Sequence, residues 1–393
     1  MNDSTVPPSA ALRLITEPLR GKARVSFPGI AGDNSGEADP ARRRLLALAR
    51  LHGVTTLLGR QLLLDPPNSW PEGLLAALRE HLHHETAREL LIESELQRLC
   101  AALAAGGVRH LLFKGAPLAY TLYPEPHLRT RCDTDLLVPE EQREAAEAVL
   151  TALGYGADMN AAGGQVASSE RMYTRTLLRG VPHVVDLHWR LSNLQSFSRA
   201  LDFAALEADA LPVPALGPAA RMPSLVHALL IACLHRSGHL DPPRIVEGIE
   251  YTPGNRLIWL YDLHLLVQCL DERDWTQFAG EAGQRGLRAV CLDGLRTAHE
   301  HFGTAVPESV LAALAAPGPR ELAAGHLHPG RWRRHWLDLR ALPDWRSRLH
   351  LLREWVFPPP VYMLRKYETT SRTALPWLYL RRVISGIWRS ARR

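Results

Sequence analysis

Two aspartates stand at the head of a short apolar run, in the segment Cys132-Asp-Thr-Asp-Leu-Leu-Val138. An apolar run of this length predicts a buried strand over residues 133–138. Because side chains alternate along a strand, Asp133 and Asp135 project to one face and Thr134 to the other. Two carboxylates held this close repel each other unless a cation or a proton lies between them. The chain must therefore fold so that this strand places both carboxylates at one site.

A third aspartate occupies the polar phase of another apolar segment, Val184-Val-Asp186-Leu-His188. If the two strands are neighbours, the three carboxylates form a metal-binding trio, for which hard cations such as Mg²⁺ or Mn²⁺ are suited. Such a trio can hold two metals roughly 3.5–4 Å apart, one at a triphosphate and one at an acceptor hydroxyl. An Asp-x-Asp pair also occurs in turns and surface caps. The apolar strand that follows and the Lys-Gly turn that precedes it favour the metal site.

Lysine is rare in this chain, and one of its three lysines, Lys114, lies in a Lys-Gly turn between a predicted strand and a predicted helix. Such a turn presents backbone N–H groups to an anion, and Gly115 lets a phosphate approach the main chain. The lysine would neutralise phosphate charge. Arg129 and Arg131 are candidates for further phosphate contacts, with a solvated arginine loop as the alternative.

Histidines and one further aspartate lie near these motifs. His188 shares a strand face with Asp186 and is predicted to touch the nucleotide or to orient a carboxylate, with a packed supporting histidine as the alternative. His235 and His239 have the i, i+4 spacing of some metal ligands but no acidic partner at motif spacing, so a structural role is favoured. Asp262 lies in an apolar helix and is expected to pair with an arginine such as Arg256, since an unpaired buried carboxylate is costly; the alternative is that it faces a cleft between the domains and meets the nucleotide.

Composition and spacing divide the chain into five parts. Residues 1–40 carry prolines and a polar run and are predicted to be a disordered or loosely packed arm. Residues 41–84 predict an N-terminal cap of short helices interrupted by prolines. Residues 85–190 form the predicted core, residues 191–316 a helical domain, and residues 317–393 a basic extension rich in Arg, Trp and Pro.

The core alternates helices and strands. A helix ends at Gly106-Gly107, and strands are predicted at residues 108–113 and 133–138. Two more, residues 172–179 and 183–189, are joined by a turn at Gly180. This order predicts an α+β fold in which a small mixed sheet carries helices on one face. The helical domain is predicted to contain helices over residues 224–235, 256–270, 275–283 and 287–302.

The composition excludes several classes of protein. The five cysteines are odd in number and widely spaced, which indicates neither a disulfide framework nor a zinc cluster and favours a reducing cytoplasm. The N-terminus lacks the pattern of a secretory signal, and no apolar stretch approaches the roughly 18 residues that span a bilayer. A net charge of +5 is mild and lies mainly in the last third, so nucleic acid is not expected as a partner.

The last residues, 377–393, combine aromatic and aliphatic side chains with five arginines and no acidic residue. Such a segment can lie on an anionic membrane surface, which would place the protein at the inner membrane surface. The alternative is a terminal helix that packs through its tryptophans and leaves its arginines in water.

Three segments of the core together resemble a family of uncharacterised bacterial nucleotidyltransferases in the DNA polymerase β-like superfamily. They are Leu-Leu-Phe-Lys-Gly-Ala-Pro-Leu-Ala, the Arg-Thr-Arg-Cys-Asp-Thr-Asp-Leu-Leu-Val segment, and Val-Asp-Leu-His-Trp. The resemblance implies that Asp133, Asp135 and Asp186 bind the catalytic metals. It also implies a Gly-Ser turn at the triphosphate, where this chain has Lys114-Gly115 instead. The acceptor cannot be carried over, because the superfamily acts on many.

The motifs and the resemblance favour a Mg²⁺- or Mn²⁺-dependent enzyme that transfers NMP from an NTP to an unidentified acceptor, such as a small molecule, sugar or peptide. The principal alternative is a catalytically retired nucleotide-binding protein that regulates or scaffolds. A nuclease-like or phosphatase-like metal site is a further alternative.

Overall fold

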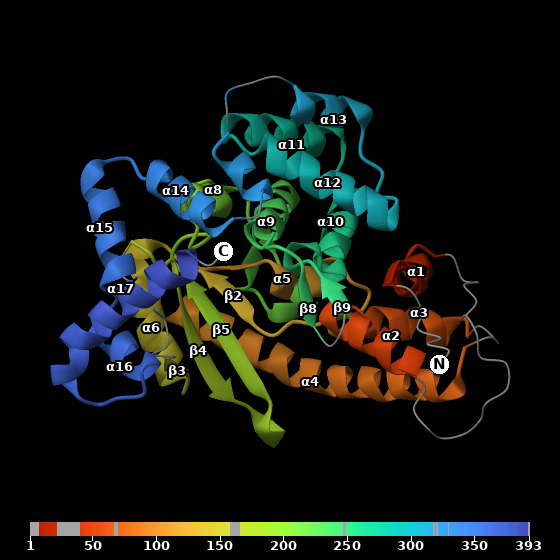
Figure 1. Cartoon of the computed structure of the whole chain (residues 1–393). Coiled ribbons are helices and arrows are strands. Elements are labelled where there is room, and N and C mark those ends of the chain that lie inside the picture. The colour runs from red at the N-terminus through yellow and green to blue at the C-terminus, as the bar shows by residue number, and fades with distance from the viewer. Residues whose placement is uncertain are drawn as a thin grey trace, which may run out of the picture.

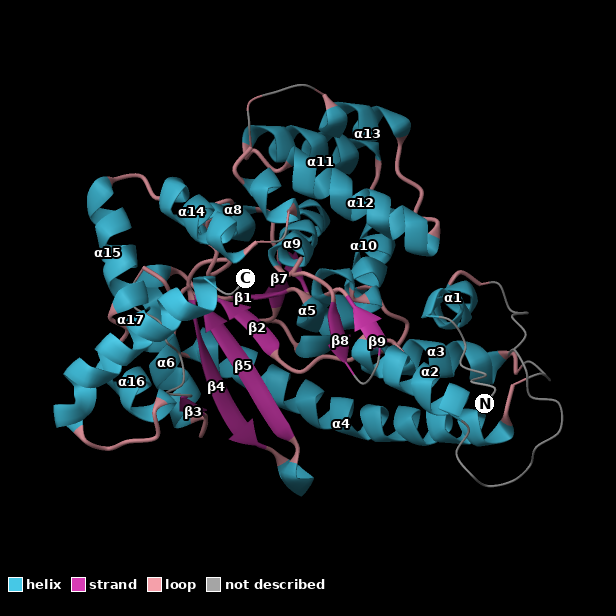
Figure 2. Cartoon of the chain, viewed as in Figure 1, coloured by secondary structure: helices cyan, strands magenta, loops and turns pink. Residues whose placement is uncertain are grey.

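The computed structural model describes residues 8–21, 40–66, 70–157, 166–246, 249–316, 319, 321–328 and 330–391. Helices surround a single five-stranded sheet (Figures 1 and 2), so the predicted α+β fold is confirmed. Among these residues, no helix combines the length and the apolarity that crossing a membrane requires.

The sheet has the strand order β1-β2-β5-β4-β3. Its strands are β1 (Leu111–Phe113), β2 (Thr134–Leu137), β5 (Pro182–His188), β4 (Glu170–Thr176) and β3 (Gly156–Ala157). β2 and β5 are parallel, and the other neighbours are antiparallel, so the predicted mixed sheet is confirmed. The hairpin between β4 and β5 also forms, but β4 begins at Glu170 rather than at residue 172.

Helix α4 (Glu72–Ala105) supports the sheet from the face of Thr134, where Arg175 of β4 pairs with Glu95 of α4. It ends at Gly106 as predicted, and its buried residues include Leu96, Leu99 and Leu103. Neither glycine nor proline occurs between Leu74 and Ala105, so the helix continues without interruption through residue 84, the predicted boundary between cap and core. The remaining core helices are α5 (Gly115–Thr121) and α6 (Arg143–Ala152).

The N-terminal part contains α1 (Pro8–Leu19), α2 (Pro40–Leu51) and α3 (Thr55–Leu64). α1 differs from the loose arm that the composition predicts, because Leu14 and Ile15 are buried in the core. Burial of these two apolar side chains offsets the entropy lost when the helix becomes ordered. The prolines and polar residues of the arm as a whole hide this local apolar pattern in the composition. Residues 1–7 and 22–39 of the arm lie outside the described residues.

The helical domain follows the sheet and stands above the end that carries the aspartates (Figure 1). Its main helices are α9 (Leu225–Gly238), α10 (Leu257–Cys269), α11 (Glu272–Gln284), α12 (Arg288–Phe302) and α13 (Glu308–Ala315), and the four predicted ones are confirmed. Short α7 (Gln195–Ser198) and α8 (Phe203–Ala208) precede them. Two small hairpins were not predicted: β6 (Leu211–Pro212) with β7 (Arg221–Met222), and β8 (Arg244–Val246) with β9 (Ile249–Tyr251).

The C-terminal extension is helical along most of its length. It contains α14 (Arg331–Ala341), α15 (Trp345–Val356), α16 (Pro360–Lys366) and α17 (Leu375–Ala391). These helices gather beside β4 and α6, at the side of the molecule opposite α1 and α2 (Figure 1).

Candidate active site

The register of the parallel strand pair brings two of the predicted aspartates together. Asp135 on β2 is the direct partner of Asp186 on β5. Residues paired in register on neighbouring strands project to the same face of the sheet. Thr134 lies on the other face, where its Oγ1 is 3.1 Å from Nε2 of His183. Two carboxylates from separate segments of the chain therefore meet, as the alternation of each strand predicts.

A compact set of potential metal ligands forms around this pair. Asp135, Asp186 and His188 each offer a ligand atom, and these atoms lie within 4.8 Å of one another. His188 is buried, and its Nε2 lies 3.0 Å from Oδ1 of Asp135. Asp133 precedes the first residue of β2 and is exposed, so it lies outside this set. Two carboxylates and an imidazole thus form the centre of the site.

Repulsion among the carboxylates raises the pKa values of two of them. Burial, together with the charges of Asp133 and Asp135, raises the pKa of Asp186 to about 6. Desolvation by the surrounding protein and the charge of Asp135 likewise raise the pKa of Asp133, although part of its surface is exposed. Carboxylates that resist ionisation in this way gain stability from a bound cation. The donor set therefore fits a hard divalent cation, because carboxylate oxygens are the ligands such ions prefer and manganese also accepts imidazole.

Lys114 is the nearest cation to this cluster. Its Nζ lies 2.6 Å from Oδ1 of Asp135. Burial alone would raise the pKa of Asp135, but Lys114 and His188 outweigh it and hold that pKa below its ordinary value. Burial likewise opposes the charge on Lys114, yet Asp135 raises the net pKa of the lysine. Both partners are therefore charged in the absence of a metal.

The backbone of Lys114 is strained. It has φ 57° and ψ −133° at the point where β1 ends and α5 begins. A positive φ is unfavourable for a residue with a Cβ, and such outliers cost on the order of 1–3 kcal/mol. Strain of this kind persists where surrounding structure holds it and is concentrated at functional sites. The turn directs the lysine towards Asp135 at this conformational cost.

Position 115 requires glycine because a larger residue would collide with Arg129, and not because of an unusual backbone angle. A Cβ at this position would lie 3.0 Å from an Nη atom and 3.2 Å from the Cζ of Arg129. The guanidinium group of Arg129 therefore packs directly over the Lys-Gly turn. The guanidinium group thus fills the space beside Gly115 in which the sequence predicts a phosphate.

Arg129 makes a buried ion pair with Asp262 of α10. Its Nε and Nη2 lie 2.8 and 2.7 Å from the two carboxylate oxygens, and Tyr123 donates a hydrogen bond to the same carboxylate at 2.7 Å. The prediction that Asp262 pairs with an arginine is confirmed, but Arg256 is the wrong partner. Arg256 instead lies over the ring of Trp259 at 5.1 Å. Because residues 129 and 262 are far apart in the sequence, no local pattern could predict that they pair.

Arg131 is also buried and paired. Its Nη2 lies 2.7 Å from Oε1 of Glu89 on α4, and the Tyr120 hydroxyl donates to the same oxygen. The guanidinium carbon lies 5.5 Å from the centre of the Tyr120 ring. The two arginines therefore attach the loop before Asp133 to α10 on one side and to α4 on the other.

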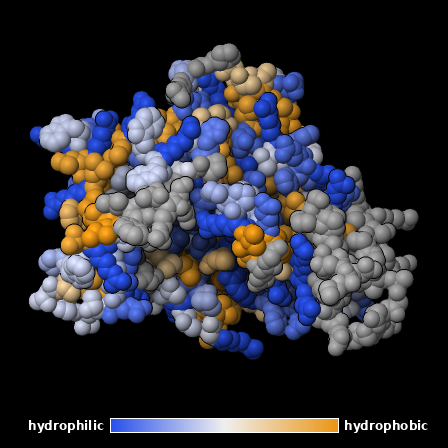
Figure 3. Space-filling model, viewed as in Figure 1, coloured by the Kyte–Doolittle hydropathy of each residue, from blue (hydrophilic) through white to orange (hydrophobic). Residues whose placement is uncertain are grey.

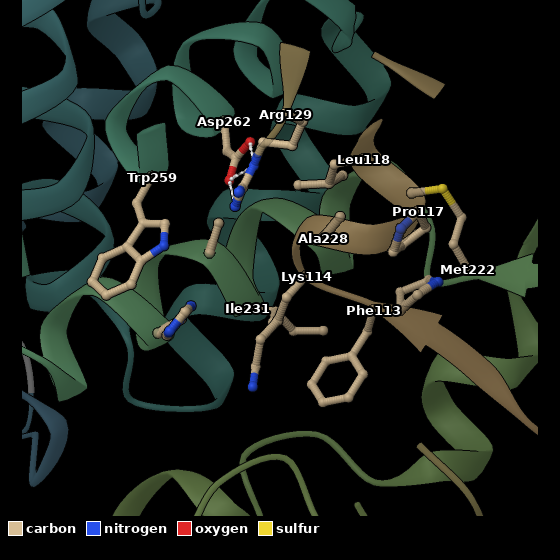
Figure 4. A pocket seen from close by; sticks show the side chains of 13 residues that line it. Phe113, Lys114, Pro117, Leu118, Arg129, Met222, Ala228, Ile231, Trp259 and Asp262 are labelled. Carbon is tan, nitrogen blue, oxygen red and sulfur yellow. Dashed lines mark hydrogen bonds and ion pairs between the residues drawn. The ribbon is translucent and has the colours of Figure 1, made fainter. Parts of the chain in front are cut away.

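Two adjoining hollows open beside Lys114, the partner of Asp135, and Lys114, Ile231 and His235 line both of them. The first extends to Trp259 on α10, and Figure 4 shows the Arg129–Asp262 pair at one end of it with Lys114 pointing away from that pair. The second passes Glu170 and reaches the loop before α7. Asp135 and His188 are therefore linked to a cleft between the sheet and the helical domain through their partners Lys114 and Glu170, which line it.

Aromatic rings form one wall of this cleft. The ring of His235 lies 4.5 Å from that of Trp259 and 4.7 Å from that of His239, measured between centroids. Burial and the charge of Lys114 lower the pKa of both histidines, so both are neutral near neutral pH. Neither belongs to a compact group of metal ligands within the described part of the chain. The wall is therefore aromatic, with its rings tilted against one another and its two histidines neutral.

Glu170 and Trp259 were missed from the sequence. Glu170 is the first residue of β4 and pairs with His188, whose Nδ1 lies 3.3 Å from its carboxylate. The alternation of Glu170, Met172 and Thr174 along β4 could have identified Glu170, because it places this residue on the same face of the sheet as Asp186. Trp259 had no such signal, since an apolar helix contains many aromatic residues that only pack.

Comparisons with known proteins agree with this geometry. No curated protein matches the chain. Residues 39–303 match the model of a family described as uncharacterised nucleotidyltransferases. The match covers the cap, the sheet and most of the helical domain, which together is more than half of the sequence. The chain therefore belongs to this nucleotidyltransferase family.

Proposed function

We propose that the protein is a divalent-metal-dependent enzyme that transfers NMP from an NTP to an acceptor. The observation that carries the proposal is the register of β2 and β5, which sets Asp135 against Asp186 beside a cleft. Membership of a nucleotidyltransferase family supports the reaction class. The excess of carboxylates, visible in the raised pKa of Asp186, supports a bound cation.

Asp135 and Asp186 would hold the metal, with Asp133 and His188 completing the site. When bound, Mg²⁺ or Mn²⁺ would neutralise charge on the triphosphate and lower the pKa of an acceptor hydroxyl. His188 is held between Asp135 and Glu170, so it orients the carboxylate against the second strand. Asp135 and His188 are buried, and together with the half-buried Asp186 they stand on strands of the sheet, which limits the reorganisation that catalysis requires.

Lys114 is the predicted cation that we place at the triphosphate, and without a metal its Nζ is paired with Asp135. It lines both hollows and points into the cleft (Figure 4). Arg129 and Arg131 are paired with Asp262 and Glu89, so in this proposal they support the nucleotide site by holding the loop before Asp133. Gly115 contributes by admitting the guanidinium of Arg129 beside the turn.

We place the nucleobase against the aromatic wall of Trp259, His235 and His239. Stacking of a base on an aromatic side chain contributes about 1–3 kcal/mol. Trp259→Ala should weaken NTP binding about 10-fold and leave the binding of inorganic tripolyphosphate unchanged. Titration calorimetry of both ligands measures this, and an equal loss for both would exclude stacking at Trp259.

The direct test is a transfer assay. The protein is incubated with each α-labelled NTP, with Mg²⁺ or Mn²⁺, and with a cell extract, and labelled products are separated. We expect label on an extract component with release of pyrophosphate, and no product in the presence of a chelator. The chemistry leaves the acceptor open among hydroxyl- or phosphate-bearing small molecules, sugars and peptides.

Two other outcomes would replace the proposal. NTP binding without metal dependence and without product would favour a retired nucleotide-binding protein that regulates or scaffolds. Release of labelled NMP without any acceptor would favour a hydrolytic metal site.

We place the enzyme in the cytoplasm and propose that its C-terminal extension brings it to the inner surface of a membrane.

A further inference from the structure

The helical part of the C-terminal extension, residues 331–393, holds most of the large apolar side chains that are exposed in the described part of the chain. Twelve of the nineteen large hydrophobic side chains that are exposed among the described residues lie within it. A cluster of exposed apolar side chains on a folded protein marks an interaction surface. The family match ends at residue 303, so this surface belongs to a part of the chain outside the shared region.

Helix α15 exposes a complete apolar face. Trp345, Leu349, Leu352 and Val356 follow the spacing i, i+4, i+7, i+11, and each is 38–67% exposed. Residues at this spacing lie in one line along a helix. Leu351 is buried and packs this helix on the protein. The exposed line is therefore a second apolar face, beyond the one that the fold uses.

Helix α17 repeats the arrangement. Trp377, Leu380 and Ile384 follow the spacing i, i+3, i+7 and are about half exposed, at 62, 51 and 47%. Leu378 is buried, and Arg382 donates a hydrogen bond to the backbone carbonyl of Trp355 on α15. In Figure 3, apolar residues gather at the left of the molecule, over the helices that Figure 1 labels α15 and α17.

The same extension is strongly basic. Residues 331–393 contain fifteen Arg and Lys residues against four Asp and Glu residues, a charge of +11, whereas the whole chain carries +5. The remainder of the chain is therefore net negative. Six of the ten tryptophans also lie in this extension. Positive charge, tryptophan and aliphatic side chains thus coincide on one part of the molecule.

We propose that α15 and α17 form a docking face for an anionic lipid bilayer. The face consists of the two apolar lines, Trp345, Leu349, Leu352 and Val356 on α15 with Trp377, Leu380 and Ile384 on α17. Amphipathic helices that lie in a bilayer surface bury such a line among the acyl chains and present basic residues to the headgroups. Tryptophan prefers the headgroup level, and each basic residue near an anionic surface adds attraction.

Other occupants fit this chemistry less well. A second copy would bring two faces of the same positive sign together, which opposes association. A nucleic acid would match the charge but would leave the leucine and valine side chains of α15 without a role, because phosphate contacts need only the basic residues. An anionic bilayer satisfies both the charge and the apolar lines.

The docking face is attached to the mouth of the cleft. Glu354 of α15 accepts hydrogen bonds from the backbone N–H groups of Val166 and Ala167, at 3.1 and 2.7 Å. Gln195 donates from its side chain to the carbonyl of Val166 at 2.9 Å. This segment leads directly into Glu170 of β4. A bilayer bound at α15 would therefore lie on the same scaffold that supports Glu170 and His188.

The experiment is co-sedimentation of the full chain with vesicles of phosphatidylcholine alone or mixed with phosphatidylglycerol. We expect sedimentation with the anionic vesicles only, reduced by high salt. Leu349→Glu with Leu352→Glu should weaken binding by about 10-fold or more, because two exposed apolar contacts are lost and two negative charges are added. These side chains are 57 and 41% exposed, so the fold has little dependence on them.

The matched control is Leu64→Glu with Leu178→Glu, which makes the same chemical change at side chains 66 and 75% exposed outside the extension. This control should bind vesicles like the wild type. Equal binding of the α15 variant and the wild type, or equal binding to neutral vesicles, would overturn the proposal. So would self-association or RNA binding that the α15 variant alone abolishes. NTP binding by the α15 variant should be unchanged, which separates this proposal from that for the cleft.

Discussion

Two cation–carboxylate pairs lie on the same cleft, and their surroundings differ. Arg129 and Asp262 form a closed pair, in which a bidentate contact and the Tyr123 hydroxyl satisfy a single carboxylate. Lys114 and Asp135 form an open pair, because further carboxylates adjoin a single lysine. The closed pair is balanced in charge, whereas the open pair is not. Charge balance thus separates a structural ion pair from a site that can accept a metal.

The largest effect that we expect is on the open pair. Asp135→Asn should reduce transfer by about 10³-fold or more, because a metal supplies several kcal/mol of charge stabilisation in such reactions. Initial rates at saturating NTP and metal measure the effect, with circular dichroism as a check on the fold. Turnover equal to that of the wild type would remove Asp135 from the reaction.

The closed pair should respond in stability rather than in chemistry. Asp262→Asn leaves the buried guanidinium of Arg129 without its counter-charge, and breaking such a pair costs about 3–5 kcal/mol. Denaturant unfolding measures this loss. The double variant Arg129→Met with Asp262→Leu should recover much of it, since apolar replacement of a whole buried pair is often tolerated. No recovery in the double variant would show that the pair does more than balance charge.

The lysine of the open pair should affect substrate binding. Lys114→Ala should weaken NTP binding by about 10- to 100-fold, since a hydrogen bond to a charged group contributes about 1.5–3 kcal/mol. Calorimetry with NTP and Mg²⁺ measures the affinity. Lys366→Ala, a change at an exposed lysine of α16, is the control and should leave it unchanged. An unaltered affinity for Lys114→Ala would place the triphosphate elsewhere.

The smallest effect has the opposite sign. In metal-free protein, Asp186→Asn should stabilise the fold by on the order of 1 kcal/mol at neutral pH, a figure reduced for partial exposure. The pKa of Asp186 is raised to about 6 in the folded state, so folding favours its protonated form. Its favourable contribution is present at low pH and is lost as pH rises from the ordinary value through 6.

The gain in Asp186→Asn should therefore be absent below the ordinary pKa of 3.8, grow as pH rises towards 6, and be complete above pH 6. Chemical unfolding across this range, with a chelator present, measures it. Destabilisation by Asp186→Asn at neutral pH would mean that the carboxylate cluster is already balanced without a metal.

The sequence predicted that Asp135 and Asp186 share a face but not that Lys114 pairs with Asp135, and it predicted the closed pair only partly. Alternation within each strand is a local property, so the faces of Asp135 and Asp186 followed directly from their neighbours in the chain. The partner of Asp262 is set by how α10 packs on the loop at Arg129, which no local pattern reports. The same limit applies to Trp259, whose position on the cleft depends on the helical domain.

Helical patterns in the sequence predicted reliably where helices form, but less reliably which partner the apolar face of each helix contacts. The apolar spacing of α9, α10 and α12 predicted helices that the structure confirms. In α15 the same kind of spacing identifies a line that the fold leaves exposed. An apolar line on a helix predicts a contact, but only the packing shows whether that contact lies within the protein.

The most direct test of the carboxylate site is Mn²⁺ binding, followed by loss of the free-ion signal in electron paramagnetic resonance. We predict that wild-type protein binds Mn²⁺ in the absence of NTP, which itself chelates the ion, and that Asp186→Asn weakens this binding at least about 10-fold. Glu141→Gln, a change at a side chain 71% exposed, should bind like the wild type. Equal Mn²⁺ affinity in Asp186→Asn and the wild type would contradict the assignment of these strands as a metal site.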